Sequence, residues 1–72
     1  MNSSERLAAF EAMLNAVQRD YAATCEKMRL LRAQGKEKTA TYRQLMGNRL
    51  QCQSILSLYK VYGLIEEPPK AE

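Results

Sequence analysis

The sequence predicts an all-α protein, an antiparallel hairpin of two helices. The first observation is a stripe of mainly apolar residues at spacings of three and four, which is typical of a long amphipathic helix. The stripe consists of Leu7, Phe10, Leu14, Val17, Tyr21, Thr24, Met28 and Leu31. The second observation is a shorter stripe that begins at Tyr42. The third is a pair of glycines, Gly35 and Gly63, each placed where one helix would end.

The first helix is expected over residues 3–34. Asn2 is a favourable N-cap residue, and Glu5 follows three positions later, as in a capping box. No proline or glycine interrupts the predicted helix. Gly35 then provides the residue type that most often ends a helix in the left-handed conformation. A helix of about 32 residues spans roughly 48 Å.

The second helix is expected over residues 42–62, after a short polar connection at residues 36–40. Thr41 and Gln44 form the T-x-x-Q pattern of a second capping box. Gly63 ends this helix. Its stripe consists of Tyr42, Leu45, Arg49, Cys52, Leu56 and Tyr59, in which the arginine is the exception.

Residues 1–65 are predicted to form a single helical-hairpin domain, followed by a flexible C-terminal tail over residues 66–72. A pair of prolines prevents the tail from forming a helix, and chain ends are commonly frayed. Leu64 and Ile65 precede the tail and are apolar, so they are able to pack against the helices.

The short connection makes the two helices antiparallel neighbours. Placing residue 34 opposite residue 42 sets the register. This register pairs Leu31 with Leu45, Cys25 with Cys52, and Val17 with Tyr59. Because the first helix is longer, Leu7 and Phe10 extend beyond the second helix. They are left for Leu64 and Ile65, or for another chain, to cover.

The second helix carries more apolar surface than one neighbouring helix can cover. Burying a Leu or Ile side chain stabilises a protein by about 1.5–3 kcal/mol, so exposing several is costly for a small domain. We therefore expect two hairpins to associate as a homodimer that forms a four-helix bundle of undetermined orientation. The expected interaction face consists of Leu7, Phe10, Met46, Leu50, Ile55, Leu58, Val61 and Tyr62.

The composition argues against an enzyme. The chain has no histidine and one aspartate, and it shows no nucleophile–base pair or glycine-rich phosphate loop. Two cysteines are too few for a zinc site, so we expect no catalytic residue, metal, cofactor or small-molecule substrate. Cys25 and Cys52 are interpreted as small buried apolar residues, with a disulfide as the alternative.

The sequence also predicts a cytoplasmic protein that does not enter a membrane. No apolar run approaches the roughly 20 residues that a transmembrane helix needs. The N-terminal residues are polar and charged, unlike the apolar core of a secretory signal.

Gly47 allows two interpretations of the second helix. A continuous helix tolerates one glycine at a cost of about 1 kcal/mol. Alternatively, Gly47 ends one helix, and Asn48 with Gln51 caps the next. The second interpretation makes residues 41–62 a helix-turn-helix.

The segment TYRQLMGNRLQCQSILSLYKVYGLIE loosely resembles the helix-turn-helix core of winged-helix regulators. In that family the recognition helix often ends in a Gly-Leu-Ile segment, as at residues 63–65. The resemblance implies amide and hydroxyl side chains in the major groove and basic side chains on phosphates. The residues implied are Arg43, Arg49, Gln51, Gln53, Ser54 and Lys60.

Two functions follow from these patterns. The leading one is a homo-oligomeric structural or protein–protein interaction module without catalytic activity. The alternative is a nucleic-acid-binding protein, which the net charge of +3 permits. The absence of acidic residues between Lys38 and Ile65 also favours the alternative. Salt-sensitive retention on DNA would distinguish the two functions.

Overall fold

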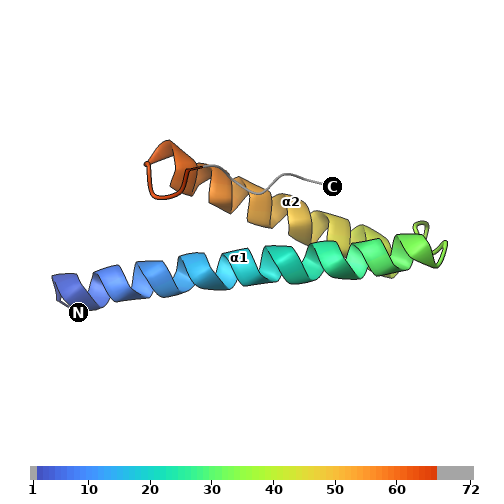
Figure 1. The fold of residues 1–72 in the computed structure, drawn as a ribbon, viewed down its shortest axis with the longest axis horizontal. Coiled ribbons are helices and arrows are strands. Elements are labelled where there is room, and N and C mark those ends of the chain that lie inside the picture. Colours follow the sequence, from blue (N-terminus) through green and yellow to red (C-terminus); the bar gives the residue numbers. More distant parts are fainter. Residues whose placement is uncertain (1, 67–72) are drawn as a thin grey trace.

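Two helices packed against each other make up the structure, a computed structural model that describes residues 2–66 (Figure 1). Helix α1 spans Ser3–Ala33 and helix α2 spans Ala40–Val61. They run antiparallel from a short loop, and the molecule measures 48 × 22 × 14 Å. The prediction of an all-α hairpin is confirmed. The predicted flexible tail lies outside the described residues, except for Glu66.

Both helices begin at a side-chain cap. The Asn2 side chain accepts a hydrogen bond from the Glu5 backbone N–H at 2.8 Å, as the capping pattern predicted. Helix α2, however, is capped by Thr39, whose Oγ1 accepts from the Tyr42 N–H at 3.2 Å. The same hydroxyl donates to the Lys36 carbonyl at 2.8 Å. The prediction that Thr41 is the cap was therefore wrong, and α2 starts two residues earlier.

Both helices end at the predicted glycines. Gly35 and Gly63 have φ values of 70° and 76°, in the left-handed region that costs other residues about 1–2 kcal/mol. After α1, Lys36 N–H bonds to the Leu31 carbonyl at 2.8 Å. After α2, Leu64 N–H bonds to the Tyr59 carbonyl at 2.9 Å. Both arrangements are Schellman motifs, and the second one fixes where Leu64 lies.

Helix α2 continues without a break through Gly47. A helix-turn-helix needs two helices joined by a turn, and residues 41–61 form one helix instead. The helix-turn-helix interpretation is therefore wrong, and the resemblance to winged-helix regulators does not extend to the fold of this segment.

The core lies in the part of the hairpin nearer the loop. Among residues 2–66, five are buried: Tyr21, Thr24 and Met28 on α1, and Tyr42 and Leu56 on α2. Met28 and Leu56 are the most enclosed, with 1% and 0% of their surfaces exposed. The Gln53 side-chain amide donates to the Tyr21 hydroxyl at 3.3 Å, which joins the two helices near the middle of α1. The core is therefore small and confined to one half of the molecule.

The helices diverge away from the loop (Figure 1). We call this part, opposite residues 34–39, the open end of the hairpin. Helix α1 has 31 residues and α2 has 22, so α1 also extends further. The Tyr59 hydroxyl donates a long hydrogen bond of 3.5 Å to the Phe10 carbonyl across the open end.

Candidate interaction surface

Exposed apolar side chains gather at the open end. Those on α1 come from its first three turns, those on α2 from its last turn, and one follows Gly63. We define the open-end cluster as Leu7, Phe10, Met13, Leu58, Val61, Tyr62 and Leu64. Val61 and Tyr62 are the most exposed, at 77% and 78%. Exposed apolar side chains gathered in one place are a common feature of surfaces that bind other macromolecules.

Two hollows give the open-end cluster its shape. One has a volume of about 250 Å³ and contains Leu7, Phe10, Tyr59 and Leu64 among its lining residues. The other, of about 210 Å³, is lined by Phe10, Met13, Leu58, Tyr59, Tyr62 and Leu64. Phe10, Tyr59 and Leu64 line both hollows, so they form the centre of the site. The site is concave and mainly apolar, with Glu11 and Asn15 at the first hollow, which suits an apolar side chain from a partner.

The predicted interaction face overlaps this surface in part. Five of its residues belong to the open-end cluster: Leu7, Phe10, Leu58, Val61 and Tyr62. Met46 and Leu50 are also exposed, but they lie in the first half of α2. Ile55 is half-buried between the helices and contributes less surface.

Sequence reasoning missed Met13 and Leu64. Met13 lies three residues after Phe10 and therefore on the same side of α1, a signal that the sequence contained. Leu64 owes its position to the Schellman motif at Gly63, which turns the chain back toward α1. Leu64 was considered only as a possible cover for Leu7 and Phe10, and it does fold back toward them, because all three line one hollow. Leu64 does not cover Leu7 and Phe10, since 60% of the Leu7 surface remains exposed.

A polar group lies between the helices, next to the core. Burial raises the pKa of Tyr21, while the hydrogen bond from Gln53 and the charge of Arg49 act in the opposite direction. Burial also raises the pKa of Cys52, and the negative charge of Asp20 adds to this effect. Both cysteines are free, and they are half-buried rather than buried as predicted. Because their pKa values are raised, Tyr21 and Cys52 stay neutral near pH 7.

The residues implied by the DNA-binding resemblance do not share one surface. Arg43, Gln51, Ser54 and Lys60 are exposed on α2. Gln53 and Arg49 instead lie half-buried against α1, and Gln53 donates its hydrogen bond to Tyr21. The buried Nε of Arg49 has no hydrogen-bond partner among the described residues. Glu26, an acidic residue of α1, pairs with Arg29 at 2.7 Å.

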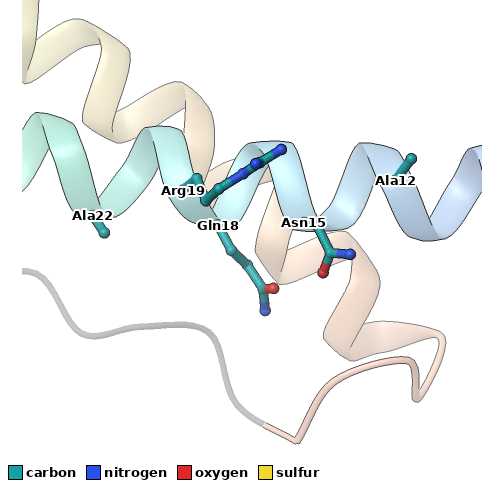
Figure 2. A pocket seen from close by; sticks show the side chains of 5 residues that line it. All are labelled: Ala12, Asn15, Gln18, Arg19 and Ala22. Atoms are coloured by element: carbon teal, nitrogen blue, oxygen red, sulfur yellow. The ribbon is translucent and has the colours of Figure 1, made fainter.

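Figure 2 shows a further hollow on the side of α1, with a volume of about 580 Å³. Its described lining residues are Ala12, Asn15, Gln18, Arg19 and Ala22. All five of these described residues come from α1, and Arg19 is the charged side chain among them.

Residues 2–66 contain no group of three or more His, Cys, Asp or Glu side chains that could hold a metal ion. Neither α1 nor α2 has the length and apolar character needed to cross a membrane. No protein-family model, curated protein or solved structure matches this chain.

Proposed function

We propose that the chain is a non-enzymatic protein–protein interaction module that works as a homodimer, in which two hairpins form a four-helix bundle. The observation that carries this proposal is the imbalance between buried and exposed apolar side chains. Four large apolar residues are buried within the described chain, whereas ten are exposed. A hairpin with so few buried side chains is marginal by itself, and a second hairpin offers the surface that it lacks.

The accessible surface supports the same proposal. The structure exposes 5504 Å², whereas a compact protein of 8.2 kDa exposes only about 4,500 Å². The excess is therefore about 1,000 Å² per chain. A stable protein–protein interface buries about 600–1,000 Å² on each partner. The excess surface of one chain is thus the right size for one interface.

Thermal unfolding over a wide range of chain concentration tests the proposal. If folding and association are coupled, the melting temperature followed by circular dichroism rises with chain concentration. A melting temperature that stays constant over about a hundredfold range in concentration would contradict the homodimer.

A further inference from the structure

We propose that the open-end cluster of one chain docks against the open-end cluster of a second copy, with the two loops pointing away from each other. This inference rests on the proposed function and adds the surface and the orientation of the dimer. The helices diverge toward the open end (Figure 1), where two hollows of about 250 and 210 Å³ lie, and a second hairpin that enters from the opposite direction would fill these hollows.

The open-end cluster is the best-formed apolar surface of the described chain. It contains seven of the ten exposed large apolar residues, and all of the seven except Val61 line one or both of the two hollows. The other three, Leu30, Met46 and Leu50, are the least continuous with it. Interfaces between copies that share a two-fold axis use the same surface patch twice. Each copy therefore supplies both the protruding side chains, such as Leu58 and Tyr62, and the hollow beside Phe10.

The distribution of charge along the hairpin favours this orientation of the two copies. Residues 26–43, which form the loop and the adjoining turns, contain six Lys or Arg residues and two Glu residues. The described residues at the open end, 2–14 and 58–66, contain two basic and three acidic residues. Bringing two loop ends together would place like charges within the screening distance of about 8 Å at physiological salt. Joining the open ends keeps the basic loops far apart and brings together surfaces with almost no net charge.

Cross-linking of native lysines tests this orientation without altering the chain. Lys60 is exposed in the last turn of α2, and Lys36 and Lys38 are exposed in the loop. A mixture of nitrogen-15-labelled and unlabelled chains, treated with an amine-reactive cross-linker, identifies links between copies by mass. We expect inter-chain links between the two Lys60 side chains and none between the two loops. Inter-chain links from loop to loop would overturn the inference and leave the proposed function intact.

A matched pair of substitutions tests the surface. Leu58 and Leu30 are both exposed, at 60% and 45%, but only Leu58 lies at the open end. We expect Leu58→Asp to raise the dimer dissociation constant at least about tenfold, because a charge would enter an apolar interface from each copy. Leu30→Asp should leave the dissociation constant unchanged. Circular dichroism checks that both variants keep their helices.

These experiments distinguish the proposed docking surface from the proposed homodimer. If Leu30→Asp dissociates the dimer and Leu58→Asp does not, the open-end cluster is not the docking surface, although the homodimer itself remains. A wild-type chain that forms no inter-chain link and sediments as a monomer would overturn the homodimer itself. In that case the open-end cluster would serve a different protein.

Discussion

Two glycines of this chain have opposite structural roles. Gly63 has φ of 76° and ends α2, whereas Gly47 lies within α2 in helical conformation. A Cβ atom added at Gly47 would meet no neighbouring atom within 4 Å. No other part of the described chain therefore packs closely against Gly47. Gly47 lowers the stability of α2, and packing within the described chain does not require a glycine there.

Gly47→Ala is expected to increase the free energy of unfolding by about 1 kcal/mol, because alanine favours the helix and has room there. The melting temperature should rise by about 4–8 °C when measured at a fixed chain concentration. Gly63→Ala is the matched control and should lower stability by about 1–2 kcal/mol, since its backbone conformation is left-handed. A loss of stability in Gly47→Ala would mean that another copy packs against this position.

Stability should fall in alkaline solution because of Tyr21 and Cys52. Burial raises both pKa values in the folded chain. The stability that these groups contribute is complete below the unfolded pKa values, about 8.5 for Cys and 10 for Tyr, and is lost as pH rises through the folded values. The urea midpoint should therefore decrease from about pH 8.5 upward, and Cys52→Ala should remove the first part of the decrease. A midpoint that rises over this range would contradict the assignment.

The start of α2 shows how a single element depends on its cap. Thr39 and Thr41 both suit an N-cap, and the sequence favoured Thr41 because Gln44 follows it in a capping box. Thr39 forms two hydrogen bonds, one with Lys36 and one with Tyr42, and it therefore connects the loop to the helix. These two hydrogen bonds explain why Thr39 caps α2 rather than Thr41, although Thr41 has the capping-box pattern.

Thr39→Ala should destabilise the chain by about 1 kcal/mol, because the first turn of α2 loses its side-chain acceptor. Thr41→Ala should change stability by only a few tenths of a kcal/mol, since Thr41 lies inside the helix on an exposed position. Urea unfolding of both variants measures the difference. A larger loss in Thr41→Ala than in Thr39→Ala would contradict the observed cap.

The helices themselves could be predicted from the sequence, because the three-and-four spacing and the terminal glycines act locally. The predicted register does not hold at the open end. Tyr59, which was predicted to pair with Val17, donates its hydrogen bond to the Phe10 carbonyl, so Phe10 lies beside the end of α2 and not beyond it. The divergence of the helices could not be predicted, since it depends on how Tyr59 and Leu64 fit against Phe10. For that reason the interaction face was predicted along all of α2, whereas the exposed surface is concentrated at the open end.

At the scale of the whole molecule, the chain is too extended for its mass. Its radius of gyration is 14.5 Å, whereas a compact domain of 72 residues has about 11 Å. One end of the hairpin is closed by a small core and a basic loop, and the other presents apolar side chains on diverging helices. A second hairpin joined at the open end would give the diverging helices a common core.

Sedimentation equilibrium of the 72-residue chain at micromolar concentration determines the molar mass in solution directly. We expect twice the chain mass of 8.2 kDa, with dissociation only on dilution. Under the same conditions Leu58→Asp should shift the mass toward a single chain, and Leu30→Asp should not. A wild-type mass of 8.2 kDa across the micromolar range would contradict the homodimeric four-helix bundle.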